Sequence, residues 1–175
     1  MEHEINCSSD EYIKKVTFSG KKKYHTFTKL IAVTKEGYIW FISKSFLGSN
    51  NDINLWNFPS NKIFKSLSED EKIAGDDGFK GLEHFSIYTQ IDAQTNEEEK
   101  FNKNFKHYRI VVENSIAQLR KWKIASHKFY SKMSDLSKAL EEHHFIIEIV
   151  AGLVNTLYFK KKPPHLSCYW NSSQT

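Results

Sequence analysis

The sequence predicts an α/β domain with a mixed sheet, and three observations support this class. Threonine and apolar residues interleave over 26–34, and an apolar run follows at 38–43, as in β-strands. Apolar residues then recur at spacings of three and four over 105–122 and again over 134–157, as in amphipathic helices. Strands followed by mixed units and two helices are typical of this class, and a chain of 175 residues suggests one domain.

The first two strands are predicted to pair as an antiparallel hairpin. Lys35-Glu36-Gly37 supplies the turn between them, because glycine tolerates a positive φ. The second strand, YIWFIS, is apolar on both faces, which predicts a central place in the sheet.

The middle of the chain predicts short elements separated by turns. They are a helix from about 48–51 through Trp56 that ends by Pro59, a polar segment at 68–71, a buried strand at 72–74, a turn at 75–78 and a strand at 85–91. The apolar face of the first long helix is expected to hold Tyr108, Val112, Ile116, Leu119 and Trp122, and that of the second Leu136, Leu140, Ile147, Val150 and Leu153. Residues 159–175 are expected to form a flexible basic tail.

Composition excludes several protein classes. With 39% hydrophobic and 14% aromatic residues, the chain is not expected to be disordered. Its two cysteines, Cys7 and Cys168, make neither a disulfide framework nor a zinc cluster, which predicts an intracellular protein. The apolar stretch from Phe145 to Phe159 is too short for a membrane span and indicates a buried helix. A net charge of +4 permits nucleic acid as a partner without requiring it.

Three carboxylates occupy positions at which α/β domains carry chemistry. Asp76 follows the strand at 72–74, Glu113 lies within the first long helix, and Asp52 begins an earlier helix. Hard cations such as Mg²⁺ prefer oxygen ligands of this kind. Each residue also has a structural interpretation: a Ser49-x-x-Asp52 capping box, an Asp-Asp-Gly turn at Asp76, and an i,i+4 ion pair of Glu113 with Arg109.

Five motifs resemble, in order, those of the DDE superfamily endonucleases, which are transposases of the Harbinger type and their bacterial insertion-sequence relatives. They are Phe18-Ser19-Gly20-Lys21-Lys22-Lys23-Tyr24-His25-Thr26, Gly48-Ser49-Asn50-Asn51-Asp52, Gly75-Asp76-Asp77-Gly78-Phe79-Lys80-Gly81-Leu82, Arg109-Ile110-Val111-Val112-Glu113-Asn114 with Leu119-Arg120-Lys121-Trp122, and Ile149-Val150-Ala151-Gly152-Leu153-Val154-Asn155. Each motif alone is weak, whereas five in the right order and spacing are specific. The likeness covers about residues 2–158.

The resemblance implies an RNase H-like domain over 1–158 with a D, D, E triad that binds Mg²⁺ or Mn²⁺. Asp76 matches the second Asp of the triad and Glu113 matches the Glu, so both are the implied catalytic residues and metal ligands. The implied reaction is two-metal cleavage of DNA phosphodiesters. We expect the chain to bind double-stranded DNA and not to bind a membrane. Whether it forms a homo-oligomer is left open. The location would be nuclear in a eukaryote and cytoplasmic in a bacterium.

No residue of the sequence matches the first Asp of the triad. In the family this Asp precedes the segment matching Glu2 to Ile5, so we expect it and most of its strand to be missing from this chain, with impaired cleavage as the result. Alternation along a strand predicts that Glu2 and Glu4 face away from the metals, and Asp10 is placed in a loop, so none replaces it. The alternative is a non-catalytic remnant of a transposase that binds DNA or a protein partner.

The cluster Lys21-Lys22-Lys23 with His25 has two interpretations. It is either a solvated turn or a patch that contacts phosphates regardless of base sequence, and the resemblance favours DNA contact. His127, His143 and His144 lack the spacing of a metal site and are interpreted as ordinary surface and core histidines.

Overall fold

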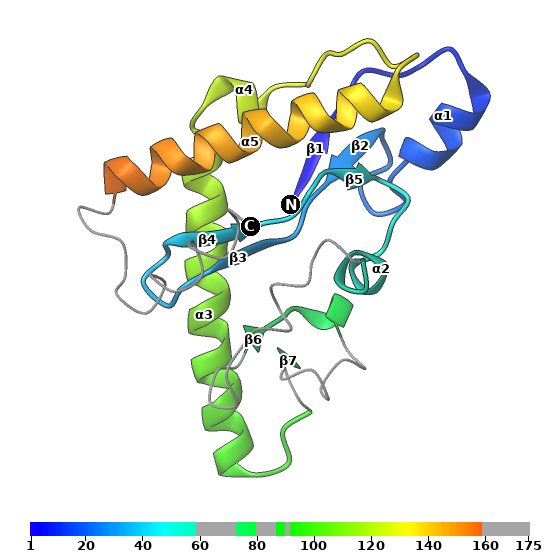
Figure 1. Ribbon diagram of the computed structural model, residues 1–175. Helices are drawn as coiled ribbons and strands as arrows, with labels where there is room; N and C mark the ends of the chain where they lie inside the picture. Colours follow the sequence, from blue (N-terminus) through cyan, green and yellow to red (C-terminus); the bar gives the residue numbers. More distant parts are fainter. Residues whose placement is uncertain (59–72, 80–86, 90–91, 159–175) are drawn as a thin grey trace.

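The computed structural model describes residues 1–58, 73–79, 87–89 and 92–158 and shows a mixed α/β arrangement (Figure 1). Its elements are β1 (Glu2–Glu4), α1 (Glu11–Thr17), β2 (Thr26–Thr28), β3 (Ile31–Val33), β4 (Ile39–Ile42), β5 (Phe46–Leu47), α2 (Asp52–Trp56), β6 (Ile73–Ala74), the 3-10 helix η2 (Asp77–Phe79), β7 (Ile87–Tyr88), α3 (Asn96–Arg120), α4 (Lys123–Ser126) and α5 (Leu136–Tyr158). The polar segment at 68–71 and the tail at 159–175 lie outside the described residues.

The described strands form three small sheets. β1, β2 and β5 pair antiparallel in that order, β3 pairs antiparallel with β4, and β6 pairs parallel with β7. The single strand predicted at 26–34 is therefore wrong, because it divides into β2 and β3. The change of partner falls between Lys29 and Leu30: the Lys29 amide still bonds to Met1 O, next to β1, whereas the Leu30 amide bonds to Ser43 Oγ, next to β4.

Strand β1 lies beside β2, with Glu2 opposite Thr28 and Glu4 opposite Thr26. Strand β2 is therefore paired on both sides, with β1 and with β5. On the other face of this ladder, His3 and Phe27 are cross-strand partners and both are buried.

The predicted hairpin is confirmed by β3 and β4. Its turn is closed by Thr34 N bonding to Tyr38 O at 2.9 Å, and Gly37 has a φ of 91°. The central place predicted for the second strand is wrong, since β4 pairs with β3 alone among the described strands. The side chain of Asn155 on α5 bonds both the N–H and the C=O of Ile39, which satisfies the backbone there.

Local capping fixes where the helices begin. α2 is capped by Asn51, whose side chain accepts from Asn54 N at 2.8 Å, so the predicted capping box at Ser49 is wrong. α1 was not predicted; Asp10 caps it by accepting from Ile13 N. α3 begins with a capping box between Thr95 and Glu98.

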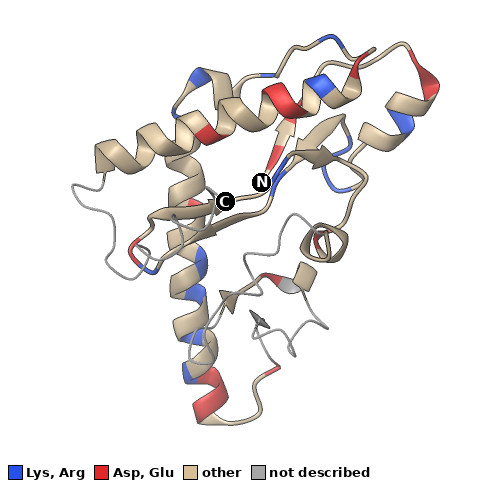
Figure 2. Cartoon of the chain, in the orientation of Figure 1, with Lys and Arg blue, Asp and Glu red and all other residues tan. Residues whose placement is uncertain are grey.

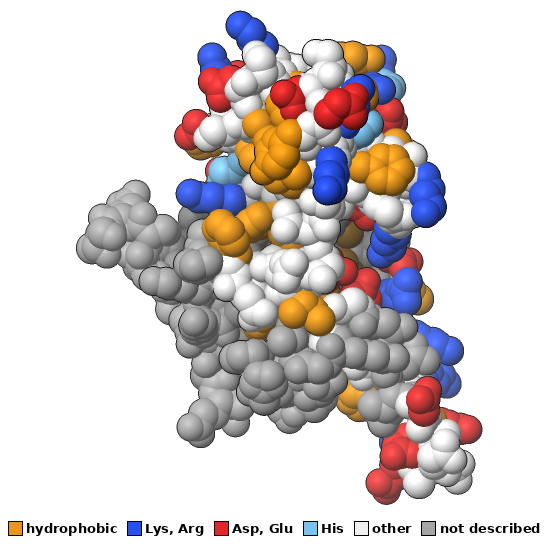
Figure 3. All heavy atoms as spheres, turned by 90° about the vertical axis from the view of Figure 1, so that its right-hand side faces the viewer, with side chains coloured by type: hydrophobic (Ala, Val, Ile, Leu, Met, Phe, Trp, Pro, Cys, Tyr) orange, Lys and Arg blue, Asp and Glu red, His pale blue; other side chains and the backbone are white. Residues whose placement is uncertain are grey.

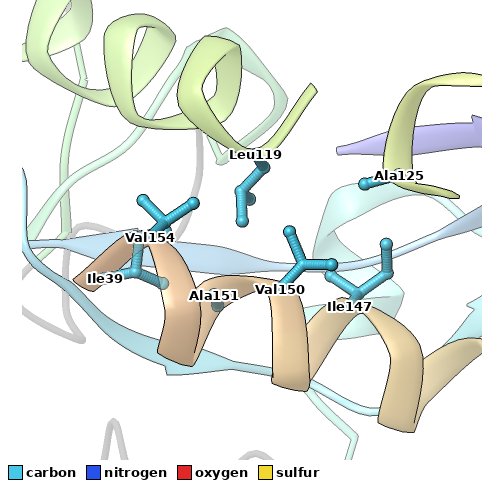
Figure 4. Close-up of a cluster of buried hydrophobic side chains, with 7 residues drawn as sticks. All are labelled: Ile39, Leu119, Ala125, Ile147, Val150, Ala151 and Val154. Carbon is cyan, nitrogen blue, oxygen red and sulfur yellow. The ribbon is translucent and has the colours of Figure 1, made fainter. Parts of the chain in front are cut away.

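The largest hydrophobic cluster lies between α3, α4, α5 and β4 (Figure 4). Its buried members are Ile39, Leu119, Ala125, Ile147, Val150, Ala151 and Val154. The predicted apolar faces are right for Leu119, Ile147 and Val150 but wrong for Tyr108 and Leu153, which are exposed. The first half of α3 extends beyond the end that α5 crosses (Figure 1).

A network of buried polar side chains joins the strands to α5. Lys29 is only 1% exposed, and its Nζ donates to Ser43 O at 2.8 Å and contacts His144 Nδ1 at 2.9 Å. His143 contacts His3 at 3.0 Å and Ser45 Oγ at 2.7 Å. These bonds satisfy groups that would otherwise be costly to bury.

Lys29 makes folding stability depend on pH. Burial lowers the pKa of its amine to about 7, against a partial opposing effect of the Glu148 charge, whereas an unfolded lysine titrates near 10.5. Between pH 8 and 10 the unfolded chain therefore binds more protons, and we expect the free energy of unfolding to rise with pH by about 1 kcal/mol per unit from this residue. Urea unfolding at several pH values measures this slope.

The matched variant is Lys29→Met, which keeps the length of the side chain without its charge. The difference in stability between wild type and variant should change with pH over this range, and a constant difference would contradict the assignment. The Met1 amine, whose pKa burial lowers to about 6, titrates below this range.

Candidate active site

A cavity of about 920 Å³ is lined by residues that lie between Met1 and Lys121 in the sequence. Its walls come from β1, β2, the turn after α1, the segment joining β5 to α2, the turn after β6 and the second half of α3. Four carboxylate residues line it: Glu2, Asp52, Asp76 and Glu113. The lining also holds four basic residues, Lys21, Lys22, Arg120 and Lys121, so acidic and basic groups share this cavity.

Asp76 follows β6 closely, as predicted, and its interpretation as a turn residue is confirmed. Its Oδ1 accepts from Gly78 N at 3.1 Å, and its backbone O accepts from Phe79 N at 3.0 Å, so it begins a turn. It is also exposed to the cavity. The turn therefore positions the carboxylate at the end of a strand, where α/β sheets bind ligands.

Asp52, the first residue of α2, places its carboxylate beside Gly78, as Asp76 does. A Cβ added to Gly78 would collide with Oδ2 of Asp52 and lie 3.1 Å from Oδ1 of Asp76, so glycine lets the two carboxylates approach. The pKa of Asp52 is raised, first by burial and then by the charges of Asp76 and Glu2. The Met1 amine and Lys21 oppose that rise.

Glu113 projects from α3, where one helical face lines the cavity. That face comprises Glu113, Ile116, Ala117, Arg120 and Lys121, at spacings of three and four. Glu113 also accepts from Arg109 Nε at 3.1 Å, as the ion-pair interpretation predicted. Both partners are well exposed, and surface pairs of this kind contribute little to stability.

Glu2 also lines the cavity, so the expectation that it faces away from the site is wrong. The register explains this: Glu2 lies opposite Thr28, which lines the cavity too, while the neighbouring His3 points to the core. Glu4 forms an ion pair with Lys128 at 3.1 Å instead.

The lysine cluster forms a tight turn, and only two of its three lysines line the cavity. Ser19 holds the turn, since its O accepts from Lys23 N at 2.8 Å and its Oγ accepts from Lys22 N. Lys21 and Lys22 line the cavity, whereas Lys23 does not and has a φ of 64°. His25 also lies outside the lining, with its Nδ1 3.0 Å from Thr17 Oγ1. Contact of these four residues with DNA stays a prediction.

The donor set suits a magnesium-type ion. All four acidic residues offer oxygen, and Mg²⁺ is usually held by one or two carboxylates with waters completing its shell. Within the described ranges, no three His, Cys, Asp or Glu side chains come close enough together to form a metal site on their own. The carboxylates that line the cavity are thus oxygen donors of the kind that Mg²⁺ binds.

The histidines are structural, as predicted. His143 is buried in the polar network beneath α5, and burial lowers its pKa to about 2. His127 offers its backbone O to His3, and His144 contacts Lys29.

Comparison with known proteins decides the family. The family model described as DDE superfamily endonuclease matches residues 1–155. The chain belongs to the DDE superfamily endonucleases. No match was found among curated proteins or among solved structures. Within the described part of this DDE endonuclease, no helix combines the length and apolarity needed to cross a membrane.

The DDE endonuclease cavity contains residues that sequence reasoning did not assign. Arg120 lies two turns after Glu113 on the same face of α3, and that seven-residue spacing could have identified it. Glu2 is missed because alternation counted from the family's first Asp predicts the wrong face. Its pairing with Thr28 places it on the face that lines the cavity. Figure 2 shows Lys and Arg both in the turn before β2 and along α3.

Proposed function

We propose that this DDE endonuclease chain is an RNase H-like domain that cleaves DNA phosphodiesters with Mg²⁺ or Mn²⁺. One observation carries the proposal: Asp76 and Glu113, the residues matching the family's second Asp and Glu, line one cavity. They reach it from a strand end and from a helix that are far apart in the sequence. As a pure turn signal and a pure surface ion pair, they would have no reason to meet.

Asp76 and Glu113 would hold the metal ions in this cavity. When bound, such ions activate the attacking water and stabilise the leaving oxygen of an in-line displacement. Asp52 approaches Gly78 from α2, as Asp76 does from the turn after β6, and burial raises the pKa of Asp52.

The basic residues would position the DNA backbone. Lys21 and Lys22 line the cavity from the turn after α1, and Arg120 lines it from α3. On the face seen in Figure 3, acidic and basic side chains lie close to one another at mid-height. Contacts of this kind bind phosphates without reading the base sequence.

We further propose that cleavage by residues 1–175 alone is impaired, because no residue matches the first Asp of the triad. The second candidate function is therefore a remnant that binds DNA or a partner without cutting. We propose action on DNA in the nucleus of a eukaryote or the cytoplasm of a bacterium.

Metal binding tests the two ligands separately from cleavage. We expect the full chain to bind Mn²⁺, detected by loss of the free-ion electron paramagnetic resonance signal. Asp76→Asn and Glu113→Gln should each weaken binding at least about tenfold, because each removes a charged ligand. Asp92→Asn and Glu99→Gln, which change exposed carboxylates elsewhere, are the matched controls and should bind like wild type. Equal affinity in all four variants would refute the assignment.

DNA binding should depend on Lys21 and Lys22 more than on Lys23. We expect the double variant Lys21→Ala/Lys22→Ala to reduce the slope of log affinity against log salt by about 2, equally for unrelated duplexes, since each phosphate contact contributes about 1. The triple variant with Lys23→Ala should add little. Fluorescence anisotropy across a salt series measures the slope.

The control for this experiment is Lys132→Ala/Lys138→Ala, which removes two lysines that do not line the cavity. An unchanged slope in the triple variant would show that the cluster is only a solvated turn.

A further inference from the structure

The segment that leaves the end of α3 is strongly basic. Residues 114–134 contain five Lys or Arg residues and no Asp or Glu, so their formal charge of +5 exceeds the +4 of the whole chain. Aromatic residues alternate with the basic ones in this segment: Trp122, Phe129 and Tyr130. Basic side chains interleaved with aromatic ones are typical of surfaces that bind single-stranded nucleic acid.

A hollow of about 370 Å³ lies against this segment, and we call it the α4 hollow. It is lined by Ile146 of α5 and by residues of α4 and the stretch after it: Lys123, Ile124, His127, Lys128, Phe129 and Tyr130. None of these lining residues is acidic. Lys128 forms an ion pair with Glu4 at 3.1 Å, so Lys123 is the lining lysine that has no acidic partner in the described part of the chain. The volume is that of a site for a small ligand, and the charge favours an anionic one.

Tyr130 presents an aromatic ring from a fixed backbone. It is 75% exposed, whereas the neighbouring Phe129 is buried. The Phe129 amide donates to Glu4 O at 2.8 Å. The Ser131 amide donates to Asn6 Oδ1 at 3.2 Å, so the backbone is held on both sides of Tyr130. An exposed ring on a fixed backbone is suited to stacking against the flat face of a nucleic-acid base.

Two elements connect the α4 hollow to the candidate active site. Lys121 lines the 920 Å³ cavity, and Lys123 lines the hollow two residues later. Consecutive Cα atoms are about 3.8 Å apart, so these two Cα atoms lie within about 8 Å of each other. In β1, Glu2 lines the cavity, and Glu4 on the same face of the strand pairs with Lys128 of the hollow. A DNA strand in the cavity would therefore reach the hollow within a few nucleotides.

We propose that the α4 hollow binds an unpaired nucleotide of a DNA strand whose adjoining part lies in the active-site cavity. The base stacks on Tyr130, and the phosphate lies beside Lys123. This inference rests on the proposed action on DNA. Neighbouring bases cover both faces of a base inside a duplex, so only an unpaired base can stack on Tyr130. Cleavage of one strand supplies such a nucleotide, because the terminal bases of a cut strand can leave the duplex.

Fluorescence anisotropy of the full chain without metal tests the proposal. The probes are a blunt duplex, the same duplex with a short single-stranded overhang, and that duplex with an abasic overhang of equal length. The two overhangs carry equal charge, so a difference between them reports contacts with the bases alone. We expect the overhang with bases to bind at least about fivefold more tightly than the abasic one, which is the lower range for one base stacked on an aromatic ring.

Variants assign this difference to the α4 hollow. Tyr130→Ala should abolish it, Tyr130→Phe should keep it, and neither should change the affinity for the blunt duplex. Lys123→Ala should weaken both overhang probes alike, because a phosphate contact does not depend on the base. The matched control is Tyr12→Ala on α1, which should keep the difference, because Tyr12 is 70% exposed but does not line the hollow.

Circular dichroism establishes that each variant is folded, and the wild-type affinities alone keep the proposal falsifiable if one is not. Equal affinity for the two overhangs overturns the nucleotide site, while binding of the blunt duplex in the same series leaves the proposed function standing. A difference that Tyr130→Ala leaves intact also overturns the site, because the base then stacks elsewhere. Failure to bind any of the three probes overturns both proposals.

Discussion

Residues 1–175 are expected to nick supercoiled DNA in Mg²⁺ at least about a thousandfold more slowly than a chain extended upstream with the missing Asp. The extension would place Asp-Gly directly before Met1, so that the Asp stands three residues before Glu2. A missing ligand in a two-metal site removes several kcal/mol of transition-state stabilisation, and each 1.4 kcal/mol is about tenfold in rate. Conversion of supercoiled to nicked plasmid measures both rates.

The structure shows where the added residues would enter. The Met1 amine donates to Lys29 O at 2.7 Å, and Met1 lines the cavity beside Glu2. The charges of the Asp52, Glu2 and Asp76 carboxylates raise the pKa of this amine, because they lie near it. Residues added before Met1 would therefore start among these carboxylates. The matched control carries Asn-Gly in place of Asp-Gly. Robust nicking by the short chain, abolished by Asp76→Ala, would show that the missing Asp is not needed.

Gly48→Ala is expected to lower the free energy of unfolding by about 3 kcal/mol. A Cβ at this position would lie 2.5 Å from Thr17 O and 2.8 Å from Thr26 O, and would collide with Thr26 Oγ1. Two of these atoms are backbone, so β5 and the end of α1 must separate to admit the methyl group. Equilibrium urea unfolding measures the loss.

The control is Gly20→Ala, because a Cβ there meets no atom within 4 Å. Its stability should lie within about 0.5 kcal/mol of wild type. Equal unfolding midpoints for the two variants would contradict the close approach at Gly48.

Elements with a strong local signal could be predicted from the sequence. The hairpin at β3–β4 followed from a glycine turn between apolar runs, and α3 and α5 followed from helical periodicity. Pairing that depends on distant residues could not be predicted. The strand expected over 26–34 divides because β2 pairs with β1 and β5 whereas β3 pairs with β4, and the backbone of Ile39 in β4 bonds to the Asn155 side chain.

The same distinction between local signals and distant pairing applies to the residues of the candidate site. Asp76 and Glu113 could be found because family motifs surround them. Glu2 and Arg120 could not be assigned, because their place in the cavity depends on the register of β1 with β2 and on which face of α3 turns inward. Carboxylate oxygens of Asp52 and Asp76 both lie beside Gly78, and neither motif alone indicates that they are neighbours.

Nicking by the extended chain with single changes at Asp76 and Glu113 tests the central claim most directly. The account predicts that Asp76→Asn and Glu113→Gln each reduce Mg²⁺-dependent nicking by at least about a thousandfold, while Arg109→Ala, which removes only the ion pair of Glu113, leaves most activity. Full nicking by Asp76→Asn, or equal losses in Glu113→Gln and Arg109→Ala, would contradict it.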